Sequence, residues 1–193
     1  VSVLLLAIST SLWLVNPQWT KPKGTPDLSV SLIQGNISQD IKWLTKYQVE
    51  TLKIYAKLTR TEWGRDVVVW PESSIPMFQD EAAGFISEMI EMANATNTTW
   101  ITGIPYKDKA AFNASTDKYP PFYNSVIARG VEAEGLYKKQ RLVPFGEYIP
   151  FEGVLDIFPS LAGSQDIKSY SRGSDQQSLL KMRGHNIGTA ICY

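Results

Sequence analysis

The sequence has very little cysteine and histidine: Cys192 and His185 are the only residues of each kind among 193. One cysteine excludes a disulfide within the chain, and no Cys-x-x-Cys pattern is present. Together the two residues cannot supply the three or four nitrogen and sulfur ligands of a typical zinc site. The sequence therefore predicts no disulfide framework, no metal site and no cofactor.

An excess of charge of one sign is also lacking, because 19 lysines and arginines balance 19 aspartates and glutamates. Proteins that bind nucleic acid usually carry a basic patch, so nucleic acid is not expected as a partner. The Gly-x-Ser-x-Gly, Gly-x-Gly-x-x-Gly and Walker patterns are absent as well. Their absence argues against an α/β-hydrolase and against a nucleotide-binding protein.

An uncharged apolar run covers residues 1–15. It is shorter than the roughly 20 residues that span a bilayer, and no basic region precedes it as in a signal peptide. We expect the tail of a transmembrane helix that ends at Asn16-Pro17, with a buried core helix as the alternative. Residues 16–27 contain three prolines and a glycine and predict a linker, so the main domain is expected over residues 28–193.

From residue 28 the sequence alternates between strand and helix patterns. Strands are predicted over residues 28–34, 66–70 and 99–104, and helices over residues 37–63 and 82–93. In the second helix the apolar residues recur at helical spacing, which predicts one buried side. The uninterrupted valines of the second strand indicate burial on both faces. This alternation predicts an α/β fold.

Antiparallel strand patterns fill most of the second half of the sequence. The predicted strands cover residues 123–129, 131–137, 178–182 and 187–193. Gly130 and Gly184 lie at the turns within the two pairs. A polar loop is predicted over residues 106–121. Residues 142–161 contain too much proline and glycine for a helix and are too apolar for an exposed loop, so we expect them to cover a site or to face an apolar partner.

Three chemically useful side chains, Glu72, Lys139 and Cys192, are predicted at the ends of strands, where open α/β sheets place their chemistry. Apolar surroundings raise the pKa of a carboxylate towards that of a general base, and a fixed ammonium stabilises a thiolate or an oxyanion. His185 is roughly 23 Å from Cys192 along a strand, too far for a Cys-His pair. The alternatives are a buried cysteine that only packs and a solvated Glu and Lys.

Three segments occur in an order typical of one enzyme superfamily. They are Trp70-Pro71-Glu72-Ser73, residues 137–150 with Leu142-Val143-Pro144-Phe145-Gly146-Glu147, and Ile191-Cys192-Tyr193. These segments resemble the nitrilase, or carbon-nitrogen hydrolase, superfamily and, more closely, its membrane branch, the apolipoprotein N-acyltransferases. Gln34-Gly35-Asn36-Ile37 and Tyr123-Asn124-Ser125 are similar to the same branch. The resemblance covers residues 28–193.

The resemblance implies a nitrilase-like α-β-β-α sandwich that is incomplete at the C-terminus, because the family continues past this sequence. It implies that Glu72 is the general base, Lys139 the oxyanion stabiliser and Cys192 the nucleophile. Three further positions match the family less directly: a supporting carboxylate and two residues near the substrate. These are Glu147, Trp43 and Tyr193. Without the strands and loop that close the family's site, this stretch alone is expected to be inactive.

The implied reaction is ping-pong acyl transfer from a phospholipid, through a thioester on Cys192, to the amine of a diacylglyceryl-cysteine on an apolipoprotein. The implied location is a bacterial inner membrane, with the domain on the periplasmic side. Lys21 and Lys23, just past the apolar run, favour the cytoplasm instead by the positive-inside rule. Two alternatives stay open: a soluble carbon-nitrogen hydrolase with the same triad and water as acceptor, and a non-catalytic membrane-associated scaffold.

Overall fold

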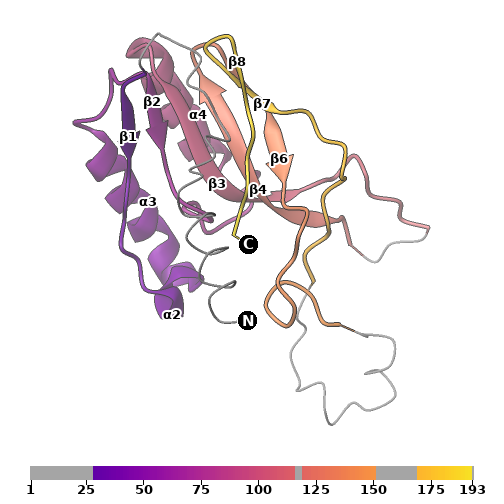
Figure 1. Ribbon diagram of the computed structural model, residues 1–193. Coiled ribbons are helices and arrows are strands. Elements are labelled where there is room, and N and C mark those ends of the chain that lie inside the picture. The colour runs from indigo at the N-terminus through magenta and orange to yellow at the C-terminus, as the bar shows by residue number, and fades with distance from the viewer. Residues whose placement is uncertain (1–27, 116–118, 151–168, 193) are drawn as a thin grey trace, which may run out of the picture.

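The computed structural model describes residues 28–115, 119–150 and 169–192 (Figure 1). The predicted transmembrane tail, the linker, most of the predicted apolar loop and Tyr193 lie outside these residues. Within the described part of the chain, no helix is both long enough and apolar enough to cross a membrane.

A five-stranded mixed sheet forms the centre of the molecule, in the order β1-β2-β3-β4-β6. Its strands are β1 (Val30–Leu32), β2 (Val67–Val69), β3 (Thr99–Lys107), β4 (Phe122–Gly130) and β6 (Leu136–Lys138). The first three strands run parallel, and β4 runs antiparallel to both β3 and β6. Val67 and Val68 point to opposite faces of β2 and are 2% and 0% exposed, so both faces are covered, which explains the unbroken apolar run. The predicted α/β class is confirmed.

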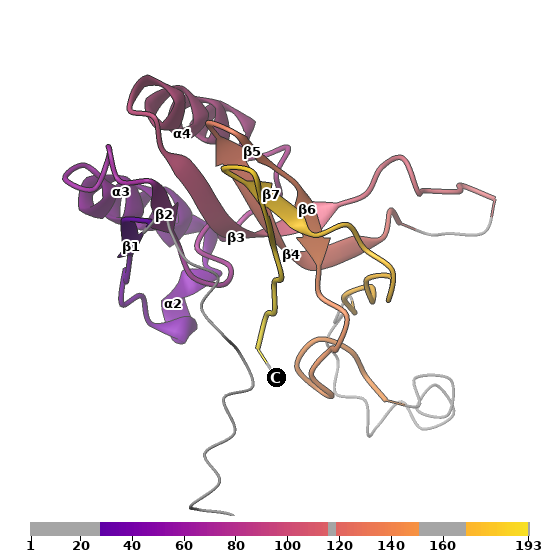
Figure 2. The ribbon, with the colours of Figure 1, turned by 45° about the horizontal axis from the view of Figure 1, so that its top comes forward.

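Two long helices, α3 (Thr45–Thr59) and α4 (Ala83–Ala95), cover one face of this sheet (Figures 1 and 2). Their apolar sides form the core with the strands beneath them. The helix residues of this core are Leu52, Tyr55, Met89 and Ala93, and the largest strand residue is the fully buried Trp100. The helix predicted over residues 82–93 is confirmed, because its apolar spacing matches one side of a helix.

The single helix predicted over residues 37–63 is wrong. The chain instead forms the short helix α2 (Gln39–Lys42) and then α3, with a break at Trp43 and Leu44. Leu44 has an extended backbone, with φ −73° and ψ 124°, and so interrupts the helix. The break lets the Lys42 side chain turn inward, where it is 7% exposed and donates to the Glu72 carbonyl oxygen at 3.0 Å. Tertiary contacts here outweigh the helical pattern.

A second, smaller antiparallel sheet has the order β5-β7-β8. Its strands are β5 (Ala133–Glu134), β7 (Leu180–Met182) and β8 (His185–Ile187). Figures 1 and 2 show it on the opposite side of β4 from α3. The predicted hairpin at Gly130 is confirmed, but Gly135, with φ +138°, divides its second strand. One piece, β6, pairs with β4 and the other, β5, pairs with β7. The predicted loop before β4 is shorter, because β3 continues to Lys107.

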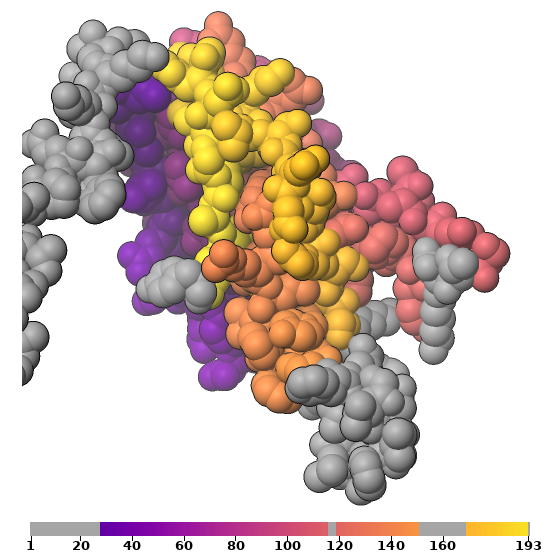
Figure 3. All heavy atoms as spheres, turned by 45° about the vertical axis from the view of Figure 1, so that its right-hand side comes forward, coloured from indigo at the N-terminus to yellow at the C-terminus, as the bar shows by residue number. Residues whose placement is uncertain are grey.

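The strand predicted over residues 187–193 is also wrong. β8 ends at Ile187, and residues 188–192 have no regular secondary structure. Cys192 has a φ of +47°, outside the strand region, and it is exposed. The thiol therefore neither ends a strand nor packs as a buried hydrophobe. Figure 3 shows this yellow segment at the surface, between the indigo-to-purple first part of the chain and the orange residues that follow β4.

Candidate active site

Glu72 follows β2 in a turn that lies directly against β3. Gly103 makes this close approach possible, because a Cβ there would lie 2.5 Å from the Ser73 backbone nitrogen and 2.7 Å from the Glu72 Cα. The Trp70 backbone nitrogen donates to the Ile101 oxygen at 2.8 Å just before the turn. The turn therefore holds Glu72 beyond the carboxyl end of β2, where the sequence predicts it.

Lys139 directly follows β6, and its side chain is 3% exposed. Its Nζ atom lies 2.9 Å from each carboxylate oxygen of Glu147 and 3.8 Å from Oε1 of Glu72. A buried ammonium needs such partners, because leaving water costs several kcal/mol per ion. The alternative of an ordinary solvated lysine is therefore wrong, and Lys139 and Glu147 form a buried ion pair.

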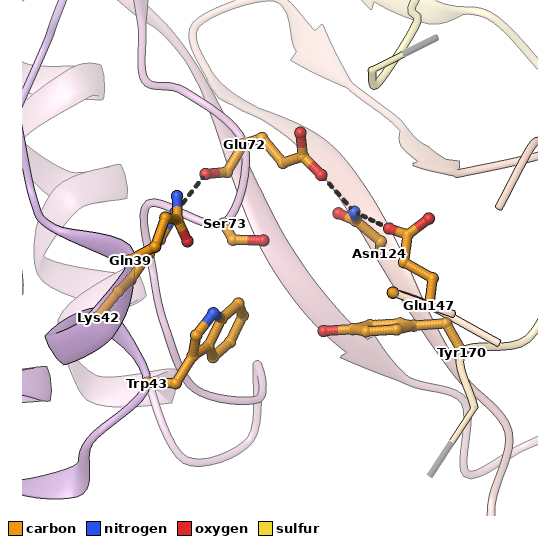
Figure 4. A pocket seen from close by; sticks show the side chains of 9 residues that line it. Gln39, Lys42, Trp43, Glu72, Ser73, Asn124, Glu147 and Tyr170 are labelled. Carbon is orange, nitrogen blue, oxygen red and sulfur yellow. Dashed lines mark hydrogen bonds between the residues drawn. The ribbon is translucent and has the colours of Figure 1, made fainter. Parts of the chain in front are cut away.

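Asn124 of β4 connects the two carboxylates. Its Nδ2 atom donates to Oε1 of Glu72 at 2.6 Å and to Oε1 of Glu147 at 2.8 Å (Figure 4). One amide and one ammonium thus lie between two negative groups and offset their repulsion. The resemblance of Tyr123-Asn124-Ser125 assigned this residue no role. One signal in the sequence could have indicated a role for Asn124. An amide side chain within a buried strand needs hydrogen-bond partners, so it is expected to contact other polar groups.

Glu147 is the more buried of the two carboxylates, with its side chain 11% exposed against 42% for Glu72. Burial raises the pKa of Glu147, but hydrogen bonds from Lys139, Asn124 and the Val143 backbone outweigh burial and hold that pKa below its usual value. Glu72 is the carboxylate that faces open space. The expectation that apolar neighbours surround Glu72 is wrong, because its carboxylate contacts the Asn124 amide and the Lys139 ammonium.

A pocket of about 310 Å³ opens beside these groups (Figure 4). Its described lining consists of Gln39, Lys42, Trp43, Glu72, Ser73, Asn124, Gly146, Glu147 and Tyr170. The structure thus brings Trp43, Glu72 and Glu147 together at one pocket, with Lys139 bound to the Glu147 carboxylate. Lys139 and Cys192 are not among the described residues that line it.

Two ionisable residues of the pocket, Lys42 and Tyr170, went unnoticed in the sequence, because only the folded chain brings them here. Burial lowers the pKa of Lys42, and the charge of Glu72 opposes that effect. Burial, and then the negative charges of Glu147 and Glu72, raise the pKa of Tyr170 to about 12. The Tyr170 hydroxyl therefore keeps its proton at neutral pH.

Comparison with known proteins identifies the family of this chain. Residues 29–193 match the carbon-nitrogen hydrolase family. The chain is 37% identical over 194 residues to the apolipoprotein N-acyltransferase of Pseudomonas aeruginosa (strain LESB58), covering 99% of this chain and 36% of that protein. It is also 37% identical over 185 residues to the enzyme of the same name from Vibrio parahaemolyticus, covering 91% of this chain and 34% of the relative. The chain thus spans about a third of the length of these curated relatives.

A solved structure is similar at the level of the fold. It is a CN-hydrolase superfamily protein from Xanthomonas campestris with an arsenic adduct in its active site. It superposes with a TM-score of 0.52 at 17% identity, over 83% of this chain and 51% of that chain. Such a likeness shows the fold alone, and that fold agrees with the predicted nitrilase-like architecture. The family match over residues 29–193 and the shared fold lead to one conclusion: this chain belongs to the carbon-nitrogen hydrolase family.

Proposed function

We propose that this chain carries the catalytic residues of an apolipoprotein N-acyltransferase in a bacterial inner membrane, with the active domain on the periplasmic side. The observation that carries the proposal is the Glu72–Asn124–Lys139–Glu147 group beside one pocket, in a chain whose curated relatives bear that name. In this proposal residues 1–15 end a transmembrane helix, residues 16–27 form a linker, and residues 28–193 belong to the catalytic domain.

In the proposed first half-reaction Glu72 takes the proton of the Cys192 thiol, and the thiolate attacks the ester carbonyl carbon of a phospholipid. A carbon–sulfur bond forms, and the Lys139 ammonium stabilises the negatively charged oxygen. The ester carbon–oxygen bond then breaks, and the lysophospholipid leaves with the proton that Glu72 returns. Glu147 supports this step, because its two contacts of 2.9 Å fix the position of the Lys139 ammonium.

In the proposed second half-reaction the α-amine of a diacylglyceryl-cysteine, at the N-terminus of an apolipoprotein, attacks the thioester. A carbon–nitrogen bond forms while the carbon–sulfur bond breaks. The proton lost by the amine passes through Glu72 to the Cys192 thiolate, which restores the starting enzyme. Trp43 lines the pocket and Tyr193 follows the nucleophile, so we assign both to the region of the substrate.

Exposed apolar side chains near the pocket favour a lipid over a small soluble amide. Trp43 lines the pocket, Leu44 follows it in sequence, and Val143 and Phe145 belong to the loop that also contributes Gly146. Phe145 is 75% exposed, and its φ of +60° is uncommon for a residue with a side chain. Such apolar exposure beside a polar site is typical of a surface that meets an apolar partner.

The covalent step is tested by mass spectrometry. The full-length protein that contains this chain, purified in detergent, is incubated with a diacyl phospholipid and digested, and the peptide that contains Cys192 is examined. We expect this peptide to gain one acyl group, and the Cys192→Ala variant to gain none. Glu72→Gln should slow the acylation by roughly 10²–10⁴-fold, the usual contribution of a general base. If wild-type protein gave no acyl adduct, the proposed mechanism would be wrong.

The acceptor is tested by adding a synthetic diacylglyceryl-cysteine peptide to the acylated protein. We expect the adduct to disappear while the peptide gains an amide-linked acyl chain. Release of free fatty acid at the same rate with and without the peptide would identify a hydrolase that uses water. Peptide binding with no adduct at any time would identify a non-catalytic scaffold.

A further inference from the structure

Tyr170 reaches the pocket from the segment that precedes β7. Its backbone nitrogen donates to the Glu147 carbonyl oxygen at 2.7 Å. The centroid of its ring lies 5.0 Å from that of Phe122, and the two ring planes are at 57°. These contacts tie the residue to Glu147 at one point and to the first residue of β4 at another. Figure 4 shows the phenol ring beneath Glu147, with its hydroxyl pointing into the pocket towards Trp43.

The hydroxyl differs from two other polar groups of the pocket, the Asn124 amide and the Lys42 ammonium, in what it contacts. The Asn124 amide nitrogen binds Glu72 and Glu147. The Lys42 ammonium donates to the Glu72 carbonyl oxygen. The Tyr170 hydroxyl, by contrast, is directed at the open space where a ligand would lie. With its pKa raised to about 12, it is a neutral donor rather than a base at neutral pH.

A donor of this kind suits an oxygen that accepts a hydrogen bond. The two carboxylates beside the hydroxyl carry negative charge, which disfavours a third anionic group close to it. A neutral ester carbonyl oxygen carries no such penalty, and it gains hydrogen-bond strength as its negative charge grows during attack. The hydroxyl lies opposite Trp43, so this donor is across the pocket from one exposed aromatic ring.

We propose that Tyr170 contacts the substrate and that its hydroxyl donates a hydrogen bond to the ester carbonyl oxygen of the acyl donor. The inference rests on the proposed function, because it requires an acyl ester in this pocket. It adds a residue that lies outside the Glu72, Lys139 and Cys192 set and comes from a different segment of the chain.

The test is Tyr170→Phe, which removes the hydroxyl and keeps the ring against Phe122. The whole protein in detergent is given either dioleoylphosphatidylethanolamine in mixed micelles or p-nitrophenyl butyrate, an ester with no headgroup. Acylation of Cys192 is timed by intact mass after acid quench, and Tm is measured in parallel. We expect roughly tenfold slower acylation by both esters with an unchanged Tm, as for the loss of one hydrogen bond to the substrate.

The matched control is Tyr106→Phe, which makes the same change on β3, outside the described lining of the pocket. It should acylate at the wild-type rate. If Tyr170→Phe lowers Tm, 3-fluorotyrosine at position 170 replaces it. That residue keeps the hydroxyl and makes it a stronger donor, so acylation should become faster, and an unchanged rate would overturn the inference.

Each result decides between the inference and the function beneath it. Wild-type rates for Tyr170→Phe with both esters would overturn the role of Tyr170 and leave the acyltransferase proposal intact. A loss with the phospholipid alone would place the contact at the headgroup and overturn the assignment to the carbonyl oxygen. Failure of the wild-type protein to form any adduct would overturn the proposed function and this inference with it.

Discussion

The charged part of the candidate site and the thiol part are built in different ways. Glu72, Asn124, Lys139 and Glu147 come from the ends or interior of three strands and the turn that follows, and hydrogen bonds of 2.6–2.9 Å join the amide and ammonium to the carboxylates. Cys192 lies in a segment without regular structure, and it is exposed. The sheet thus positions the charged groups of the candidate site, whereas no described strand pairing positions Cys192, the proposed nucleophile.

Mutations should affect the charged group and Cys192 differently. Each member of the charged group compensates a charge on another, so removing one leaves a buried group without its partner. The Cys192 side chain, by contrast, is exposed. Substitutions in the charged group should therefore reduce stability and activity together, while Cys192→Ala should abolish acyl transfer with an unchanged Tm.

The largest combined effect is expected for Lys139→Met. The Glu147 carboxylate, which is mostly buried, would lose the ammonium 2.9 Å away, and Glu72 would lose its nearest cation. We expect a loss of roughly 3–5 kcal/mol in the free energy of unfolding, typical of a broken buried pair. Acyl transfer should fall by at least roughly 10²–10³-fold, typical of a lost oxyanion donor. Urea unfolding and a timed acylation assay measure the two effects.

Lys138→Met is the matched control, because Lys138 directly precedes Lys139 in the sequence. Its Nζ atom lies 2.6 Å from Oδ2 of Asp108, and neither residue is in the described lining of the pocket. We expect it to cost about 1 kcal/mol, as for a partly solvated pair, and to leave acylation near the wild-type rate. Equal losses of stability in the two variants would show that the buried pair has no special importance. The contrast between the two parts of the site would then fail.

The next effect tests the backbone beneath Glu72. In Gly103→Ala the new methyl group would collide with residues 71–73, so the turn must shift away from β3. We expect a loss of roughly 1–3 kcal/mol from overpacking, and a fall in acylation of roughly 10²-fold, because small displacements of catalytic groups are costly. Thermal unfolding and adduct formation on Cys192 report the two losses.

Gly84→Ala serves as the comparison for this change. Gly84 lies in α4, where an added Cβ would meet no atom within 4 Å. Alanine is favoured over glycine by about 0.5–1 kcal/mol inside a helix and by less in the first turn, where Gly84 lies, so this variant should be as stable as the wild type or slightly more so, and fully active. A Gly103→Ala protein that behaved like Gly84→Ala would show that the tight contact does not position Glu72.

The sequence was sufficient to predict an element where a local pattern is compatible with only one kind of secondary structure. The valine run of β2, the spacing of α4 and the hairpin at Gly130 were predicted correctly, because each is a local signal. Glu72 and Lys139 could also be placed, since each follows a strand that the sequence marks.

The sequence was insufficient where distant residues decide the local structure. The break before α3 occurs beside Lys42, whose ammonium contacts the Glu72 carbonyl oxygen, 30 residues further along the chain. The link through Asn124 depends on β4 lying between the two carboxylates. At the end of the chain the apolar residues 187–192 have strand composition, yet only Ile187 belongs to a strand. Composition reports propensity, and it does not show whether a partner strand is present.

The smallest effect concerns pH and the Glu147 carboxylate. Its pKa is below the usual value in the folded protein and returns to about 4.3 on unfolding. A lowered folded pKa contributes stability that is fully present above the unfolded pKa and is lost as the pH falls through the folded pKa. The wild-type protein should therefore lose more stability than Glu147→Gln as the pH is lowered from about 6 to about 3.

Urea unfolding at a series of pH values measures this difference. Other carboxylates with lowered pKa values, such as Asp66 and Asp108, are present in both proteins and cancel when the two curves are subtracted. Glu134→Gln is the control, since Glu134 is exposed and lies 4.0 Å from Lys181, and its curve should run parallel to the wild type. If the Glu147→Gln curve were also parallel, the hydrogen bonds that hold Glu147 ionised would contribute nothing to stability. The difference between the charged group and the irregular segment that carries Cys192 would then not extend to stability.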